Sequence, residues 1–248
     1  PFFQPIFDLI SGKIVGCEVL ARWVKADGSI VLPYQFIPLS EQTGRIVPLT
    51  WQLVDNALAQ LRPYLRSDKN FRVAFNFGAS HLLQPGFADD LRRHVTGARV
   101  GSRNIVIELT EREELPDLDH AANLISSLQE RGYVIALDDA GTGHSGLSYV
   151  QKLGADVIKI DKFFVDSVVT TRSARVLIEL LVNLAKELGM TTVAEGIETQ
   201  EQADALRSLG VDKGQGYLVS PAVPCAKFLA LLELNKLSRE LAETTRAA

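Results

Sequence analysis

The sequence is poor in cysteine and histidine, the residues that build disulfide frameworks and zinc centres. Its two cysteines, Cys17 and Cys225, lie far apart and show no zinc-type spacing. This usage argues against a disulfide scaffold and favours a reducing compartment. The histidines form no pair at helical or strand spacing, so zinc is not expected. They are His81, His94, His120 and His144.

Long apolar runs and a surplus of positive charge are also missing. The most apolar helical run, which begins at Arg175, is too short and too often interrupted by polar residues to span a bilayer. A net charge of −4 without a basic patch argues against binding of DNA or RNA duplexes. No signal peptide pattern is visible, and the first residue is Pro1 rather than methionine. We therefore expect a single cytoplasmic domain over residues 1–248, excised from a longer multidomain protein and without membrane contact in this segment.

Apolar strand patterns recur along the chain, and helical patterns separate most of them. The first two, "FFQPIFDLI" and "KIVGCEVLARWV", are joined by a tight turn at Ser11-Gly12, which permits only an antiparallel hairpin. Six further strand patterns follow: "RVAFNF", "NIVIEL", "YVIALDD", "DVIKID", "TTVAEG" and "GQGYLV". The helical patterns lie around 50–65, 87–97, 119–131, 145–153, 173–189 and 200–209, with a last helix after Pro224.

This rhythm of strands and helices requires parallel strands joined by right-handed crossovers. Eight strands with no linker rich in proline, glycine or serine predict one α/β domain, a TIM-like (β/α)₈ barrel whose first strand is antiparallel. A doubly wound open sheet is the alternative.

Polar residues interrupt the apolar strands close to their carboxyl ends, which share one mouth in a barrel. The reversed first strand brings its amino-terminal end, near Gln4, to the same mouth. The residues expected there are Glu18, Asn76, Glu108, Asp138, Asp139, Lys159, Asp161, Glu195 and Gln215.

Crowding carboxylates at one rim raises their pKa values unless cations balance them. The five carboxylates in question are Glu18, Glu108, Asp138, Asp139 and Glu195. Oxygen ligands of this kind suit Mg²⁺ or Mn²⁺. Two such ions close together fit in-line displacement at a phosphodiester, and Lys159 could hold a water or a phosphate oxygen.

Simpler interpretations exist for each residue taken alone. Asp138 and Asp139 could cap a following helix, and single glutamates could serve in salt bridges. The pattern Gly-x-Gly-x-x-Gly at 141–146 could suggest a dinucleotide loop, but the preceding acids would repel a pyrophosphate. A loop over the mouth fits better, with Glu111 placed to hydrogen-bond it.

The motifs resemble those of the EAL domain, a bacterial cyclic di-GMP phosphodiesterase family, in family order over essentially the whole chain. The motifs are "FQPI", "EVLAR", "FNF", "IELTE", "DDAGTG", "IKID", "AEGIE" and "QGYLVSP". The resemblance implies hydrolysis of cyclic di-GMP to linear 5′-pGpG, which lowers the level of this second messenger. It also implies two Mg²⁺ or Mn²⁺ ions as cofactors, with Ca²⁺ binding but not supporting turnover.

The resemblance also implies roles for particular residues. The metal ligands would be Glu18, Asn76, Glu108, Asp138, Asp139 and Glu195. Lys159 would orient the nucleophilic water, and Glu195 is alternatively a general base. Gln215 would support the catalytic centre. Glu111 would anchor the loop after Asp139. The substrate contacts would be Gln4, Leu20, Arg22, Asp161, Glu198 and Pro221. Family members often form homodimers through helices corresponding to 145–190.

The sequence departs from the family pattern at Ala140, where a phenylalanine is usual. This change would loosen the packing of the loop without removing a ligand. It leaves open a receptor that binds cyclic di-GMP without turnover. A metal-dependent barrel enzyme that stabilises an enolate is a third hypothesis, against which only the order of the motifs argues.

Overall fold

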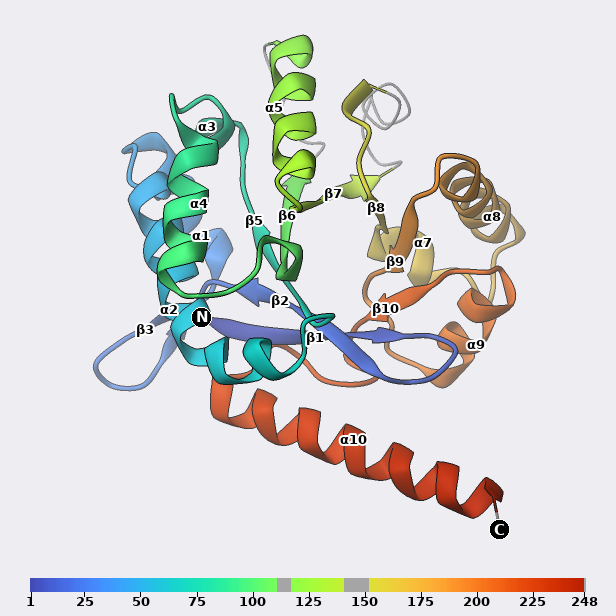
Figure 1. Cartoon of the computed structure of the whole chain (residues 1–248). Helices are drawn as coiled ribbons and strands as arrows, with labels where there is room; N and C mark the ends of the chain where they lie inside the picture. Colours follow the sequence, from blue (N-terminus) through green and yellow to red (C-terminus); the bar gives the residue numbers. More distant parts are fainter. Residues whose placement is uncertain (111–116, 141–151, 248) are drawn as a thin grey trace.

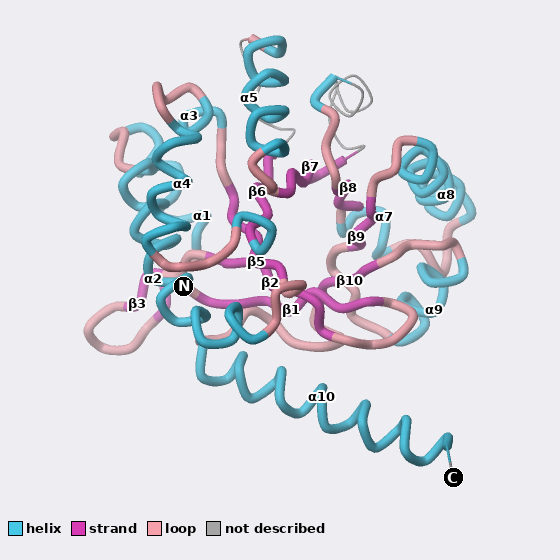
Figure 2. The backbone as a smooth tube through the Cα atoms, in the orientation of Figure 1, coloured by secondary structure: helices cyan, strands magenta, loops and turns pink. Residues whose placement is uncertain are grey.

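The computed structural model describes residues 1–110, 117–140 and 152–247, and leaves aside the side chains of Thr110, Asp139, Ala140 and 242–247. The described residues contain a closed eight-stranded barrel (Figures 1 and 2). Its strands follow the ring order β1-β10-β9-β8-β7-β6-β5-β2. They are β1 (Phe2–Asp8), β2 (Ile14–Leu20), β5 (Arg72–Asn76), β6 (Ile105–Thr110), β7 (Val134–Ala140), β8 (Val157–Ile160), β9 (Thr191–Ala194) and β10 (Lys213–Gln215). The predicted barrel is confirmed, and a closed ring excludes the open sheet.

Strand β1 runs against the direction of both its neighbours, as the short first turn predicts. It is antiparallel to β2 and to β10, whereas the other neighbouring strands of the barrel are parallel. Gly12 takes a φ of +67° in the turn between β1 and β2, a conformation that glycine adopts without strain. The register sets Gln4 opposite Glu18, so both residues reach the same end of the barrel.

Helices surround the barrel (Figure 2). They include α1 (Pro33–Gln42), α2 (Ile46–Ser67), α3 (Ala79–Leu82), α4 (Phe87–Gly97), α5 (Leu118–Glu130), α7 (Lys162–Asp166), α8 (Arg172–Glu187), α9 (Gln200–Ser208) and α10 (Cys225–Ala247). Among the described residues, no helix has the length and apolar character that a membrane crossing needs. The helices predicted around 50–65, 87–97, 119–131, 173–189 and 200–209, and the one after Pro224, are all present within a few residues. Most of the helix predicted at 145–153 lies outside the described residues.

Some local elements differ from the sequence prediction. Helix α1 was not predicted because it contains Pro33 and Pro38. A proline in the first turn of a helix is nevertheless favourable, because the backbone N–H groups of that turn have no hydrogen-bond partner within the helix. The second predicted strand was too long. Strand β2 stops at Leu20, and Trp23–Val24 (β3) instead pairs with Ile30–Val31 (β4) outside the barrel.

The side chains inside the barrel form layers, because successive residues of a strand point to opposite faces. The middle layer is apolar and built from small or β-branched residues together with Ile6: Ala74, Val106, Val134, Ala136, Val157 and Val193. The polar residues of the predicted mouth lie above this layer, toward the carboxyl ends of the strands. Arg72 and Lys213 begin β5 and β10 at the opposite end.

Helix α10 lies along the outside of the barrel beside β1 (Figure 1) and is tied to the first hairpin by one side chain. The Asn235 Oδ1 atom accepts a hydrogen bond from the Ile14 N–H at 3.0 Å, and its Nδ2 atom donates to the Gly12 carbonyl at 2.9 Å. The two ends of the chain are therefore joined by a bidentate contact.

Replacing Asn235 with alanine should lower the free energy of unfolding by about 1 kcal/mol, because one partly buried and one exposed backbone group lose a hydrogen-bond partner. Urea denaturation would measure this loss, with Lys236→Ala on the exposed side of the same helix as the control. Equal losses in the two variants would contradict the proposed tie.

Candidate functional site

The predicted residues of the barrel mouth gather around one lysine. The Lys159 side chain on β8 is 2% exposed, and four carboxylates from four other segments lie close to its Nζ atom. The distances from Nζ are 2.7 Å to Glu195 Oε1, 2.9 Å to Glu108 Oε2, 3.2 Å to Asp138 Oδ1 and 3.7 Å to Glu18 Oε2. We call these five residues the carboxylate ring.

The members of the ring differ in depth. Glu108 and Glu18 have side chains that are 2% and 8% exposed and form its floor. Asp138 and Glu195 are 14% and 21% exposed, so they form the side of the ring that a substrate can reach from solvent. A ligand would therefore meet Asp138 and Glu195 first.

Glu18 is fixed by two amide side chains. Asn76 Nδ2 donates to Glu18 Oε1 and Gln215 Nε2 donates to Glu18 Oε2, each at 2.7 Å. Burial alone would raise the pKa of the Glu18 carboxyl, but Lys159 and these two donors together hold the pKa below its ordinary value. Glu18 is consequently a buried, ionised carboxylate.

Among the described residues, no amide side chain donates to Glu108 or Glu195, and the pKa values of these two carboxyls shift in the other direction. Burial raises the pKa of Glu108 well above its ordinary value, and the attraction of Lys159 does not offset it. Burial likewise raises the pKa of Glu195 to about 7. The pKa of Lys159 is raised well above its ordinary value, because the surrounding carboxylates outweigh the effect of burial. One ammonium thus does not balance the four carboxylates.

The chemistry of the ring fits a hard divalent cation. Its donors are carboxylate oxygens and the Asn76 amide oxygen, without cysteine or histidine, and the excess negative charge calls for a further cation. Within the described residues, no three acidic, histidine or cysteine side chains already converge as a ready set of ligands. Lys159 lies between the carboxylates instead.

The segment around Gln215 is shaped by a close backbone approach. A Cβ atom on Gly216 would lie 2.1 Å from the Ile197 carbonyl oxygen, so only glycine fits there. This approach directs Gln215 into the ring, where its Oε1 atom is buried and has no hydrogen-bond partner among the described residues. An unpaired buried oxygen is a further acceptor beside the ring.

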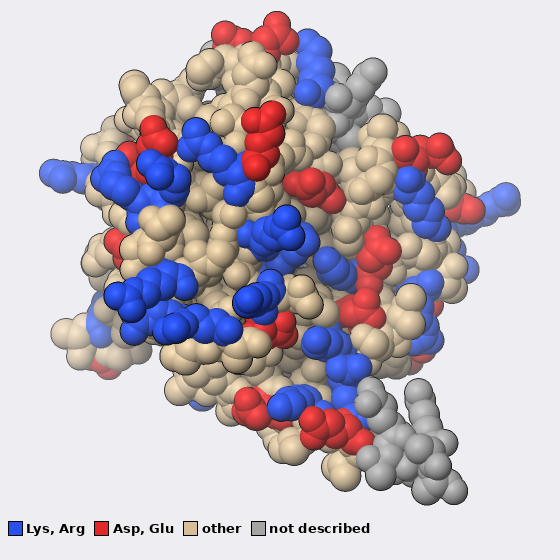
Figure 3. All heavy atoms as spheres, in the orientation of Figure 1, with Lys and Arg blue, Asp and Glu red and all other residues tan. Residues whose placement is uncertain are grey.

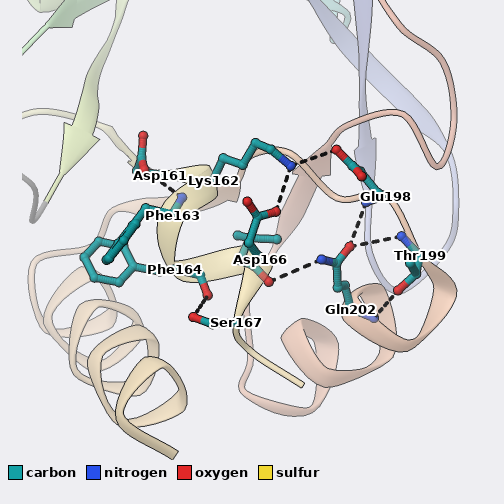
Figure 4. Close-up of polar contacts among 10 residues, drawn as sticks. Asp161, Lys162, Phe163, Phe164, Asp166, Ser167, Glu198, Thr199 and Gln202 are labelled. Carbon is teal, nitrogen blue, oxygen red and sulfur yellow. Dashed lines mark hydrogen bonds and ion pairs between the residues drawn. The ribbon is translucent and has the colours of Figure 1, made fainter. Parts of the chain in front are cut away.

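Asp161 and Glu198 make separate polar contacts around α7 (Figure 4). Lys162 Nζ reaches between Asp166 and Glu198, at 2.7 Å from each carboxylate. The Asp161 side chain accepts from the Phe163 N–H at 2.7 Å and caps α7. Among the described residues, no hydrogen bond or ion pair joins Asp161 or Glu198 to the carboxylate ring.

The opposite side of the mouth carries Leu20 and Arg22. The Arg22 guanidinium lies over the Phe2 ring at 5.9 Å and donates to its neighbour's carbonyl, Ala21 O, at 2.8 Å. Leu20 and Asn76 line a pocket of about 250 Å³ between the strand ends and the first helices. The sequence did not predict this pocket, because much of its wall comes from α1 and α2 at positions that read as ordinary apolar residues. Gln4 lies opposite Glu18, and Pro221 is exposed after β10.

The side chains of two predicted residues are not described in the structure. Glu111 falls outside the described residues, and Asp139 is described only as part of the β7 backbone. The structure brings together Glu18, Asn76, Glu108, Asp138, Lys159, Glu195 and Gln215.

Known proteins are similar to this chain in sequence and in fold. The EAL domain profile matches residues 1–222. The probable cyclic di-GMP phosphodiesterase PdeB of Escherichia coli K12 is 42% identical over 93% of this chain and 44% of its own length. The cyclic di-GMP phosphodiesterase PdeL of the same organism is 40% identical over 93% of this chain and 64% of its own length. The chain therefore spans about half to two thirds of these curated relatives.

The solved structure of the PaMucR phosphodiesterase in its c-di-GMP complex has a TM-score of 0.85 at 30% identity. The match covers 92% of this chain and 92% of that structure's chain. The EAL enzyme Bd1971, with cAMP and cyclic di-GMP bound, has a TM-score of 0.87 at 31% identity, covering 93% of this chain and 64% of that one. The fold, the order of the motifs and the family match over residues 1–222 all lead to the same conclusion: the chain belongs to the EAL domain family.

Proposed function

We propose that this protein hydrolyses cyclic di-GMP to linear 5′-pGpG, by in-line attack of a water on one phosphodiester. The observation that carries the proposal is the carboxylate ring, which collects oxygen donors from separate strands at the open end of an EAL barrel. Support comes also from relatives that are named as cyclic di-GMP phosphodiesterases and match over most of this chain.

The proposed metal ligands are the oxygen-bearing residues of the mouth. They are Glu18, Asn76, Glu108, Asp138, Asp139 and Glu195. Divalent ions held there, Mg²⁺ or Mn²⁺, would supply the acidity that activates water and the positive charge that a phosphodiester transition state needs. Ca²⁺ would bind to the same oxygens without supporting turnover.

The remaining mouth residues would position the reactants. The Lys159 ammonium, already hydrogen-bonded to Glu108 and Glu195, would fix the orientation of the attacking water. Gln215 holds Glu18 in place by its hydrogen bond at 2.7 Å. Glu195, the most exposed of the four carboxylates, is the proposed proton acceptor if a general base operates. Glu111 is proposed to anchor the loop that follows Asp139.

Substrate would lie across the mouth between its two sides. The planar guanidinium of Arg22 can fork onto phosphate oxygens, and Gln4, Leu20 and Pro221 lie on elements near it. Glu198 and Asp161 lie on the far side, where their acceptors could meet the N–H groups of a guanine after Lys162 releases Glu198.

A direct assay tests the proposal against its alternative. Purified protein with Mg²⁺ should convert cyclic di-GMP to 5′-pGpG, and chromatography would measure the product. A chelator should abolish this activity. Tight binding of cyclic di-GMP without product, with either Mg²⁺ or Mn²⁺, would instead identify a non-catalytic receptor. Activity with Ca²⁺ equal to that with Mg²⁺ would contradict the proposed choice of ions.

We also propose that two copies pair through α8, which has an exposed apolar face. Val176, Leu177 and Leu180 are 44%, 45% and 59% exposed, and Phe163 on the preceding α7 is 72% exposed. Neighbouring apolar side chains on one helix surface are typical of protein interfaces. A second copy of this chain would cover them.

The substitution Leu180→Glu should shift the protein from dimer to monomer, because burying a charge in an apolar contact is unfavourable. Light scattering coupled to size-exclusion chromatography would measure the mass. Leu234→Glu, on the exposed surface of α10, is the matched control and should leave the mass unchanged. A monomeric wild-type protein at high concentration would refute the pairing.

A further inference from the structure

A cavity of about 270 Å³ lies inside the barrel, below the carboxylate ring and away from the mouth that would bind substrate. Glu108 and Lys159 line its inner end, and residues of the middle layer form its walls. Gly16, Ala74 and Ala136 contribute little or no side-chain volume, which explains why this part of the barrel is not filled. Asn70, Arg72 and Lys213 line the opposite end.

Arg72 and Lys213, the basic residues at the end of the cavity opposite Lys159, have no direct acidic partner among the described residues. Neither Arg72 nor Lys213 makes an ion pair or hydrogen bond to a side chain in the described part of the protein. The two carboxylates nearest to Lys213 accept hydrogen bonds from other groups. Asp8 Oδ1 accepts from Ser11 at 2.7 Å, and Asp212 Oδ2 accepts from Thr192 at 2.8 Å.

Lys213 is in an unfavourable environment as it stands. Burial lowers the pKa of its ammonium, and the like charge of Arg72 lowers it further, although Asp212 and Asp8 oppose both effects. Figure 3 shows that Lys and Arg side chains are numerous across the centre of this face, with Asp and Glu side chains among them. An anion between the two basic groups would relieve the repulsion.

We propose that the cavity binds a small tetrahedral oxyanion of the phosphate class between Arg72 and Lys213. The Arg72 guanidinium offers parallel N–H donors that match two oxygens of such an anion, and Lys213 adds a third donor. The Asn70 amide at the rim supplies a neutral donor. The narrow apolar walls exclude a nucleic acid duplex and favour a compact ion. The anion would lie at the end of the cavity away from the carboxylate ring, although Glu108 and Lys159 of that ring line the other end.

Inorganic phosphate is the probe that tests this site on the whole chain. Isothermal titration calorimetry and ³¹P NMR line broadening should both detect binding that chloride at equal ionic strength does not reproduce. Arg72→Gln and Lys213→Gln should each weaken phosphate affinity by at least about tenfold, since each removes one charge-assisted contact. Arg72→Lys, which keeps the charge but not the fork, should lie between Arg72→Gln and the wild type.

Arg103→Gln is the matched control, because Arg103 lines a different hollow, with Lys69 and Arg99. Phosphate affinity should be unchanged in this variant. The proposal fails if the wild type binds phosphate no better than chloride. It also fails if Arg103→Gln loses as much affinity as the other variants, which would indicate a diffuse basic surface. Undiminished binding in both Arg72→Gln and Lys213→Gln would place the ion elsewhere, the carboxylate ring included.

Discussion

Replacing Glu18 with alanine is expected to lower the rate of cyclic di-GMP hydrolysis by about 100- to 1000-fold, a loss typical of removing one electrostatic element of a catalytic site. Glu18 is the carboxylate that the structure holds most firmly, by Asn76 on one oxygen and Gln215 on the other. Its removal takes away one proposed metal ligand and also leaves one buried and one partly buried amide N–H group without that acceptor. Steady-state kinetics with Mg²⁺ would measure the loss, and calorimetric titration of Mg²⁺ should show weaker binding.

Glu201→Ala is the matched control for this prediction, since Glu201 is an exposed carboxylate in the first turn of α9, away from the ring. Its rate should stay within about twofold of the wild type, as is usual for a surface substitution. Circular dichroism would verify that the Glu18 variant is folded. A folded Glu18→Ala protein with nearly full activity would contradict the proposed role of the ring.

Replacing Lys159 with methionine should destabilise the protein by about 3–5 kcal/mol in the absence of divalent ions, the usual cost of removing one partner from a buried ionic cluster. Four carboxylates lie within 3.7 Å of the Lys159 ammonium, and its loss would leave their charges uncompensated. Denaturant unfolding with a chelator present would measure the change. Addition of Mg²⁺ should raise the melting temperature of this variant more than that of the wild type.

Lys162→Met provides the matched control, because Lys162 also contacts two carboxylates but is 46% exposed. Solvent screens such contacts, so we expect a change of about 1 kcal/mol or less. Similar losses in the two variants would show that burial of the Lys159 cluster does not govern its contribution. A lack of response to Mg²⁺ in the Lys159 variant would argue against a cation site among these carboxylates.

The barrel and most of the residues around Lys159 could be predicted, because both follow from periodicity along the chain. Strand ends recur with polar residues, and parallel strands bring their ends together whatever their detailed packing. Glu108 and Asp138, for example, belong to neighbouring parallel strands that the sequence alone marks clearly. The direction of β1 followed from the length of one turn.

The central position of Lys159 could not be predicted in the same way. It depends on how the strands are staggered around the ring, which sets the height of each side chain. The cavity below it left a signal in the sequence, since Gly16, Ala74 and Ala136 are small residues at inward positions. That signal is weak without the register, because small residues in strands are common. Helix α1 was missed because two prolines masked its helical pattern.

The pairing of β1 with β10 has a consequence for synthesis of the chain. Strand β1 emerges from the ribosome before the other strands of the barrel, but one of its two edges has no partner until residues 213–215 have also been made. Until then the nascent barrel is an open sheet with exposed edges at β1 and β9, the kind of edge that pairs with other chains. Closing the ring requires contact across nearly the whole sequence, and such closure is slow. The barrel therefore cannot close until residues 213–215 have been synthesised, about 200 residues after β1.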